Sequence, residues 1–449
     1  MPITFPDGFL WGAATSGYQI EGAPTADGKR PSIWDVFVRQ PGKILHGDTG
    51  DIACNAYDPK QLEGDLDLMA GLGLKAYIFS VQWPRIQPEG RGVVNPKGLD
   101  YYKRLVDGLR RRGIVPALTL YHWELPQALQ ERGGWLERDT AMRFVEYATI
   151  LHDALAARVP LWITQNEPHT SAWLGHGVGK HAPGLTGVKN ALTAAHHLLL
   201  SHGMAVQALR GRGGATTRFG PVLAVTPARP ASPEKPGDHA AAKVFDGEQN
   251  RLFLDPIFKG EYPADVLKRH DKAADGFAFV REGDLAAIHT PVDFLGVNYY
   301  TPTYLAAERD GSPAWRPPPG PTTAMGWAID PAGLHETLLR VKTEFTGDLP
   351  LYVSENGASF RDYLTPEGKC HDPERVDFMR DHLREAHRAM AEGVPLKGYF
   401  VWSLLDNFEW DTSYLQRFGL VYVDYPTQRR VPKSSFEWYR EVINQNRVE

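Results

Sequence analysis

The chain has 449 residues, 42% of them hydrophobic and 23% charged, which is typical of a globular protein with one large core or two to three average domains. The formal net charge of -5 argues against nucleic acid or an anionic membrane as a partner. Two cysteines, Cys54 and Cys370, provide no disulfide framework and favour a reducing, cytoplasmic location. We see no pattern of a secretory signal and no apolar run long enough to span a membrane.

Short apolar runs without alternation predict eight buried strands. In chain order they cover residues 9–14, 76–83, 115–122, 161–166, 219–226, 293–299, 349–354 and 397–403. Helical patterns lie between several of them, as over residues 99–109, 144–155 and 376–390, and Gly113 and Gly393 are expected stops. This alternation predicts an α/β fold, a single (β/α)8 TIM barrel over residues 1–449. A doubly wound open sheet is the alternative, but residues 15–19 lack its usual glycine-rich turn.

Three stretches between the predicted elements are expected to be long loops. Residues 17–60 would form the first, and the Pro- and Gly-rich residues 227–237 and 311–321 would follow the fifth and sixth strands. Loops at the carboxyl ends of barrel strands form the mouth of the active site, so these loops are expected to build it.

Two glutamates follow predicted strands, each with an asparagine beside it. Glu167 stands in Thr-Gln-Asn-Glu-Pro after the fourth strand, and Glu355 stands in Val-Ser-Glu-Asn-Gly after the seventh. A carboxyl group at a buried strand end is costly unless it has partners or a function. Non-neighbouring strand ends face each other across a barrel mouth, and two facing carboxyls are what hydrolysis of a glycosidic bond requires. Two solvated loop glutamates are the less favoured alternative.

Other predicted strand ends carry neutral hydrogen-bonding groups and aromatic rings. They are Gln19 with Glu21, Trp83 with Arg85, His122 with Trp123 and Glu124, Asn298 with Tyr299 and Tyr300, and Trp402 followed by Glu409 and Trp410. Sugar hydroxyls are recognised by such groups, because each hydroxyl both donates and accepts. Core packing is the alternative for a single aromatic residue such as Trp83 or Tyr299.

Metal catalysis is the competing enzyme class, since the chain has 16 histidines. We find no His-x-His after the first strand, no His-Glu-x-x-His and no Cys-x-x-Cys, and we predict neither a metal nor a cofactor. His196, His197 and His202 lie in a helical pattern and are interpreted as packing or surface residues. Residues 175–179, Gly-His-Gly-Val-Gly, are interpreted as a loop and not as a phosphate-binding turn.

From residue 5 to about residue 438 the chain resembles glycoside hydrolase family 1, the β-glucosidase type. The motifs that carry the resemblance are residues 9–15, 18–22, 166–168, 355–357 and 402–410. The resemblance implies a retaining β-glycosidase that acts on terminal non-reducing β-D-glucosyl residues, with some β-galactosidase or β-fucosidase activity. Glu355 would be the nucleophile and Glu167 the acid/base. The partner would be a small-molecule glycoside, and the oligomeric state stays open.

The resemblance also assigns supporting roles. Arg85 and Tyr300 would contact Glu355 and keep it ionised, and Asn298 would bond near the acid/base. Substrate-binding residues would be Gln19, His122, Trp123, Asn166, Asn298, Tyr300, Trp327, Trp402, Glu409, Trp410 and Phe418, with Trp402 beneath the sugar ring and Trp327 on the leaving-group side.

Double displacement needs carboxyl groups about 5–5.5 Å apart, and their closeness predicts a bell-shaped dependence of rate on pH. We expect Glu355 to raise the pKa of Glu167, and Arg85 to lower the pKa of Glu355.

Several alternative activities are compatible with the same motifs. Glu409 disfavours a 6-phospho-β-glycosidase and Glu167 disfavours a thioglucosidase, whereas transglycosylation and a non-catalytic sugar-binding barrel stay open. The chain departs from the usual family pattern at Gln165, His169, Thr170, Ala224, Ser354 and residues 54–59.

Overall fold

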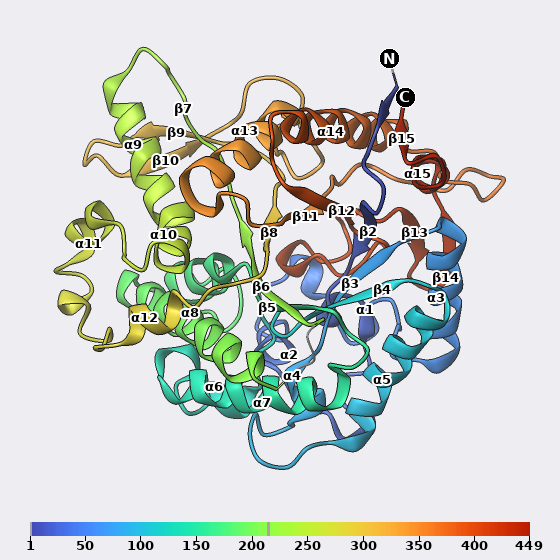
Figure 1. Cartoon of the computed structure of the whole chain (residues 1–449), viewed down its shortest axis with the longest axis horizontal. Coiled ribbons are helices and arrows are strands. Elements are labelled where there is room, and N and C mark those ends of the chain that lie inside the picture. Colours follow the sequence, from blue (N-terminus) through green and yellow to red (C-terminus); the bar gives the residue numbers. More distant parts are fainter. Residues whose placement is uncertain (1, 213–215) are drawn as a thin grey trace.

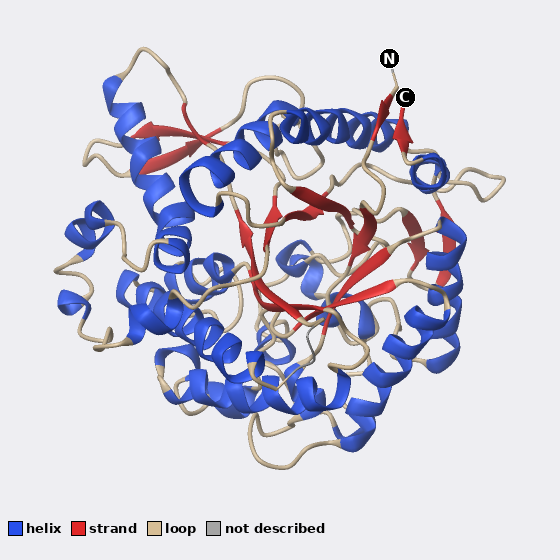
Figure 2. Cartoon of the chain, in the orientation of Figure 1, coloured by secondary structure: helices blue, strands red, loops and turns tan. Residues whose placement is uncertain are grey.

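Eight parallel strands close into a barrel in the computed structural model, which describes residues 2–212 and 216–449 (Figures 1 and 2). Around the barrel the strands are β2 (Leu10–Ala14), β3 (Ala76–Ser80), β4 (Val115–Thr119), β5 (Leu161–Asn166), β6 (Arg218–Ala224), β8 (Leu295–Asn298), β11 (Leu351–Asn356) and β12 (Leu396–Trp402). The predicted strands and the (β/α)8 barrel are confirmed. The second strand ends at Ser80 and not at Trp83, because Trp83 opens the short helix α4 (Trp83–Ile86).

Helices surround the strands, as Figure 2 shows. The longer ones are α3 (Pro59–Leu72), α5 (Pro96–Arg111), α7 (Asp139–Leu155), α8 (Val188–Arg210), α9 (Pro236–Asp246), α13 (Pro331–Val341), α14 (Pro373–Ala391) and α15 (Ser434–Gln445). Local sequence sets their ends: Asp58 caps α3 by accepting from the amides of Lys60 and Gln61, and Gly73 ends it at φ 83°. The shorter helices are α1 (Gly17–Glu21), α2 (Ile33–Phe37), α6 (Gln127–Gln130), α10 (Leu252–Phe258), α11 (Ala264–His270) and α12 (Asp284–Ile288).

The barrel interior is filled by apolar side chains, so it is a core and not a channel. Its buried members are Ala14, Ala76, Ile78, Ala117, Leu161, Ile163, Val222, Phe294, Phe400, Trp402 and Phe418. Small and large residues alternate around it: a Cβ on Gly12 would lie 2.2 Å from the ring of Phe400, so only glycine leaves room for that ring. A second, larger cluster packs the outside of the barrel against the helices.

The two Pro- and Gly-rich segments contain strands, which corrects the loop prediction. β7 (Ala228–Pro230), β9 (Thr303–Ala307) and β10 (Pro313–Arg316) form a sheet of their own in the order β10-β9-β7, at the upper left of Figure 1 beside α9. Turn-rich composition concealed them: β7 pairs with the distant β9 (Ala228 opposite Thr303), and β9 and β10 form a hairpin of short strands. Residues 175–177 also differ from prediction, since they belong to a π-helix, Thr170–Gly177.

Two small strand pairs complete the described fold. β1 (Ile3–Thr4) pairs with β15 (Arg447–Val448), which brings the chain ends together (Figure 1), and β13 (Val421–Asp424) pairs with β14 (Arg429–Pro432). Among the described residues, no helix has the length and apolar character needed to cross a membrane.

Candidate active site

A cavity of about 590 Å³ opens at the carboxyl ends of the barrel strands. Its size is in the range of small-molecule sites. The predicted site residues that line it are His122, Trp123, Glu167, Asn298, Tyr300, Trp327, Glu355, Trp402, Glu409, Trp410 and Phe418. Gln19 and Asn166 lie immediately behind this wall, because Gln19 donates to Glu409 at 3.3 Å and Asn166 lies 3.2 Å from the ring nitrogen of His122.

Glu167 follows β5 and is held at both carboxyl oxygens. The Asn298 amide donates to Oε1 at 2.8 Å, and the Thr170 hydroxyl donates to Oε2 at 2.9 Å. Burial raises the pKa of Glu167, and these two donated bonds act in the opposite direction. The predicted contact of Asn298 with the acid/base candidate is therefore present.

Glu355 stands on β11, where its backbone is paired with Asn298 of β8. Tyr300 donates its phenol hydrogen to Oε2 of Glu355 at 2.6 Å, as expected. Burial, and next the charge of Glu167, raise the pKa of Glu355 well above its usual range. Asn298 thus lies between the two carboxyl groups: its amide bonds Glu167, its backbone pairs with Glu355, and its side chain also acts against the rise in the Glu355 pKa.

Arg85 does not contact Glu355, so that prediction is wrong. Its Nε donates to Glu21 at 2.6 Å, Nη2 donates to the carbonyl of Gly22 at 2.6 Å, and the guanidinium stacks 3.8 Å from the ring of Tyr57. Arg85 belongs to α4, beyond the end of its strand, and there it is buried against the first loop. The expected lowering of the Glu355 pKa by Arg85 is wrong for the same reason.

The carboxyl end of β12 carries the opposite part of the cavity wall. Gln19 donates to Asn407 at 3.0 Å and to Glu409, and Asn407 donates to Ser403 at 3.0 Å. Burial raises the pKa of Glu409 to about 8, whereas it lowers the pKa of His122 to about 3. Burial thus favours the neutral forms of both Glu409 and His122, which suits both to hydrogen-bonding sugar hydroxyls.

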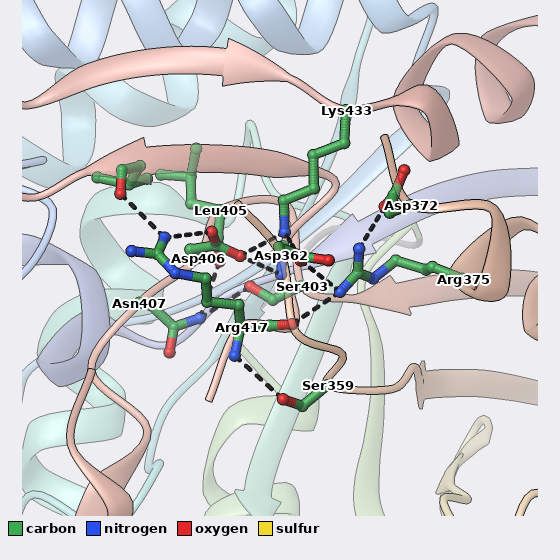
Figure 3. Close-up of polar contacts among 12 residues, drawn as sticks. Ser359, Asp362, Asp372, Arg375, Ser403, Leu405, Asp406, Asn407, Arg417 and Lys433 are labelled. Carbon is green, nitrogen blue, oxygen red and sulfur yellow. Dashed lines mark hydrogen bonds and ion pairs between the residues drawn. The ribbon is translucent and has the colours of Figure 1, made fainter. Parts of the chain in front are cut away.

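A buried ionic network anchors this segment from behind, as Figure 3 shows. Asp406 accepts from Lys433 at 2.7 Å and from Arg417 at 2.7 Å. Lys433 also pairs with Asp362, which accepts from Arg375 at 2.8 Å. Every one of these charges has an opposite partner, so the network avoids the cost of an unpaired buried charge.

Three of the residues that line the cavity have a strained backbone conformation. Trp123, Glu167 and Trp410 adopt φ values of 84°, 47° and 49°, a region in which a side chain costs on the order of 1–3 kcal/mol. Gly357, two residues after Glu355, is required by close contact, since a Cβ there would lie 1.7 Å from the carbonyl oxygen of Trp402. Such strain persists only where the surrounding structure imposes it.

The outer part of the cavity differs chemically from the inner part. Trp327 contacts Tyr300 edge to face at 5.4 Å, and the outer wall continues with apolar and aromatic side chains from the small sheet. These are Tyr304, Leu305, Pro313, Trp315 and Pro318, with Phe245 of α9. Trp315 is 59% exposed and extends this apolar wall toward the solvent.

Residues noted for departing from the family pattern face different surroundings. Gln165 points to the helical layer, where it donates to Ser201 at 2.8 Å. Ser354 donates to Asn298 at 2.7 Å and Thr170 bonds Glu167, so both support the carboxyl pair. Cys54 is buried, with its thiol 3.0 Å from the carbonyl oxygen of Asp406.

Several contributors to the site carried no predicted role: Thr170, Ser354, Asn407, Lys433 and Trp315. Only Thr170 had a readable signal, because it stands three residues after Glu167 in a segment with helical spacing. His196, His197 and His202 are buried in α8, as the packing interpretation expected. Within residues 2–212 and 216–449, no group of three or more His, Cys, Asp or Glu side chains is arranged to hold a metal ion.

The barrel mouth holds two carboxyl groups and a wall of hydrogen-bonding and aromatic side chains, an arrangement typical of a glycoside hydrolase. Comparison with known proteins agrees. The model of glycosyl hydrolase family 1 matches residues 1–448. "Beta-glucosidase A" of Acetivibrio thermocellus is 44% identical over 449 residues, covering 99% of each chain. The "Bifunctional beta-D-glucosidase/beta-D-fucosidase" of Bifidobacterium breve is 44% identical over 466 residues, again covering 99% of each.

A solved structure agrees with these relatives. The β-glucosidase from Thermotoga maritima in complex with glucoimidazole superimposes with a TM-score of 0.95 at 44% identity, covering 99% of each chain. The chain therefore belongs to glycosyl hydrolase family 1.

Proposed function

We propose that this protein is a retaining β-glucosidase that releases terminal non-reducing β-D-glucosyl residues from oligosaccharides and from aryl or alkyl glucosides. One observation carries the proposal: two buried carboxyl groups, Glu167 and Glu355, share one cavity and are linked through Asn298. The relatives named as β-glucosidases support the same reaction, and the bifunctional relative supports β-D-fucosidase activity as well.

In the first step Glu167 gives its proton to the glycosidic oxygen while Glu355 attacks the anomeric carbon. The leaving group departs with the electron pair of the broken bond, and a glycosyl ester forms on Glu355. In the second step Glu167 takes a proton from water, which displaces Glu355 and restores the starting configuration. Tyr300 favours ionised Glu355, because its phenol donates to the carboxylate and burial raises the phenol pKa well above its usual range.

The sugar would lie over Trp402 with its hydroxyls bonded to the wall formed by Gln19, His122, Asn166, Glu409 and Trp410. Glu409 is partly buried, and no lysine or arginine pairs with it in the described part of the chain. A phosphate at that position would need such a cation, so a neutral sugar is favoured over a 6-phosphosugar. We further propose a cytoplasmic location and one catalytic domain; the unpaired thiols of Cys54 and Cys370 support the location.

The test is release of 4-nitrophenol from the β-glucoside, the β-galactoside, the β-fucoside and the 6-phospho-β-glucoside. We expect the β-glucoside to react with the wild-type protein and not with Glu355→Gln. Glu131→Gln, an exposed position, is the matched control. Folded wild-type protein that releases nothing from any of the four would overturn the proposal.

A second variant tests the role of Glu355 itself. Glu355→Gly should hydrolyse nothing in water but should form the α-glucosyl azide when azide is added, because azide then enters from the vacated face. A β-configured azide product would contradict the nucleophile role. Product analysis with added cellobiose separates hydrolysis from transfer to a sugar hydroxyl.

A further inference from the structure

The two carboxyl oxygens of Glu167 have partners of different chemistry. Oε1 accepts from an amide nitrogen of Asn298, whereas Oε2 accepts from the hydroxyl of Thr170. An amide nitrogen only donates, but a hydroxyl both donates and accepts. The two oxygens are therefore unequal before any substrate binds.

The orientation of the Asn298 amide is fixed by its remaining contacts. Its Oδ1 accepts from Ser354 at 2.7 Å, and its Nδ2 donates to Asn166 at 3.3 Å as well as to Glu167. Exchanging oxygen and nitrogen would break all three bonds. Oε1 of Glu167 thus faces a permanent donor and stays unprotonated.

We propose that Oε2 of Glu167 carries the transferable proton and that Thr170 is a positioning residue for it. This inference rests on the proposed acid/base role of Glu167. In the first step the Oε2–H bond breaks and the proton joins the glycosidic oxygen. That oxygen keeps the electron pair of its bond to the anomeric carbon, and Glu355 forms the new bond to the same carbon. The Thr170 hydroxyl then donates to a fully ionised Oε2, and a hydrogen bond to a charged group is roughly twice as strong as a neutral one.

Thr170 is suited to this role by position as well as by chemistry. It is the first residue of the π-helix that follows Glu167, it is 7% exposed, and it lines the cavity. Its backbone amide also donates to the carbonyl oxygen of Glu167 at 2.9 Å. The hydroxyl is thereby held beside the carboxyl group by the local fold and does not depend on a bound ligand.

Other titratable groups share the cavity, and a substitution at Thr170 leaves all of them in place. They are Glu355, Tyr300, Glu409, Asp411, Lys180, Tyr304 and the histidines His122, His169 and His181. Burial lowers the pKa of both His122 and His169 to about 3, so these two are neutral over the working range. Glu409, whose pKa burial raises to about 8, titrates in the same range, but the side chain of Thr170 bonds Glu167 and not Glu409. A shift of the alkaline limb that appears only when the Thr170 hydroxyl is removed is therefore assigned to Glu167.

The test compares Thr170→Val, which removes the hydroxyl and keeps the branched shape, with Thr170→Ser, which retains it. Loss of the bond to the carboxylate raises the pKa of Glu167, so the alkaline limb of kcat/KM should move up by about one pH unit in Thr170→Val. The kcat/KM for cellobiose should fall by about tenfold, because its leaving group needs a proton. The kcat/KM for 2,4-dinitrophenyl β-D-glucoside should stay within about twofold, since that group leaves unprotonated.

Thr170→Ser should restore the wild-type position of the alkaline limb and the wild-type kcat/KM for cellobiose. Ser171→Ala, which removes the neighbouring buried hydroxyl, should change neither of these two quantities. An alkaline limb that does not move in Thr170→Val would overturn the inference. So would an equal loss of kcat/KM on cellobiose and on the 2,4-dinitrophenyl substrate in that variant. Glu167→Gln separates the two levels of the argument. If it loses cellobiose hydrolysis but keeps the 2,4-dinitrophenyl substrate while Thr170→Val changes nothing, only the role of Thr170 fails; if it still hydrolyses cellobiose, the acid/base assignment fails.

Discussion

Replacing Tyr300 by phenylalanine isolates one hydrogen bond to the proposed nucleophile. The phenol donates to Oε2 of Glu355 at 2.6 Å, while its ring packs 5.4 Å from Trp327 and 6.3 Å from Phe418. Phenylalanine keeps the ring contacts and removes only the donor. The buried carboxylate then loses a partner that favours its ionised form.

The expected size of the effect follows from that geometry. A hydrogen bond to a charged group contributes about 1.5–3 kcal/mol, which corresponds to about one to two pKa units. Burial already raises the pKa of Glu355, and loss of the phenol raises it further. Glu355 must be ionised to attack, so Tyr300→Phe should lose activity on the acid side, and the acid limb of the profile should move up by about one to two pH units.

The assay is kcat/KM for 4-nitrophenyl β-D-glucoside across the pH range, with thermal unfolding recorded on the same samples. Tyr363→Phe is the matched control, because Tyr363 is 70% exposed. An acid limb that stays in place would refute the reasoning. So would a loss of the same factor at every pH, which would assign Tyr300 to substrate binding and not to the ionisation of Glu355.

Three further predictions concern stability and specificity. Lys433→Met removes the cation that Asp362 and Asp406 share; each aspartate keeps one arginine, but one buried negative charge is left uncompensated. The free energy of unfolding in denaturant should therefore fall by roughly 3–5 kcal/mol, against no measurable change for the exposed Lys397→Met, and a fall below about 1 kcal/mol would contradict the role of the network. Burial raises the pKa of Glu124 to about 8, so the folded state retains a proton that the unfolded state releases, and stability falls as pH rises from about 4.5 to 8. Glu124→Gln removes that dependence, and its stability relative to wild type should increase by up to about 1.4 kcal/mol per pH unit between pH 5 and 8, whereas parallel curves would refute this. Trp315→Ala should lower kcat/KM for octyl β-glucoside by roughly fivefold and leave kcat/KM for the 4-nitrophenyl β-glucoside unchanged, since only the longer aglycone reaches the outer wall. Equal effects on the two substrates would exclude the indole from aglycone binding.

The barrel and the two glutamates were readable from the sequence because their signals are local. A strand buried on both faces requires an apolar run, and residues 161–163 and 351–353, directly before the two glutamate motifs, provide such runs without any knowledge of their neighbours. Position at a strand end then places Glu167 and Glu355 at the mouth, since all strands of a parallel barrel end on the same side. The shifted end of β3 and the concealed sheet β10-β9-β7 show where such signals weaken: before a proline-containing helical turn, and in short strands with Pro- and Gly-rich sequence.

Side-chain partners were decided by the tertiary structure. Arg85 was predicted to contact Glu355, but it pairs with Glu21. The reason is that α4 begins after the strand, and this helix directs the Arg85 side chain away from the barrel mouth. Asn298 and Glu167 are 131 residues apart, and the bond between them exists only once the barrel closes.

The same holds for the network behind β12, whose five charged residues are spread over residues 362–433. Apolar periodicity and turn chemistry act over a few residues and so determine the elements and their order. Hydrogen bonds and ion pairs depend on directions and distances of a few ångströms, and only the closed fold sets these.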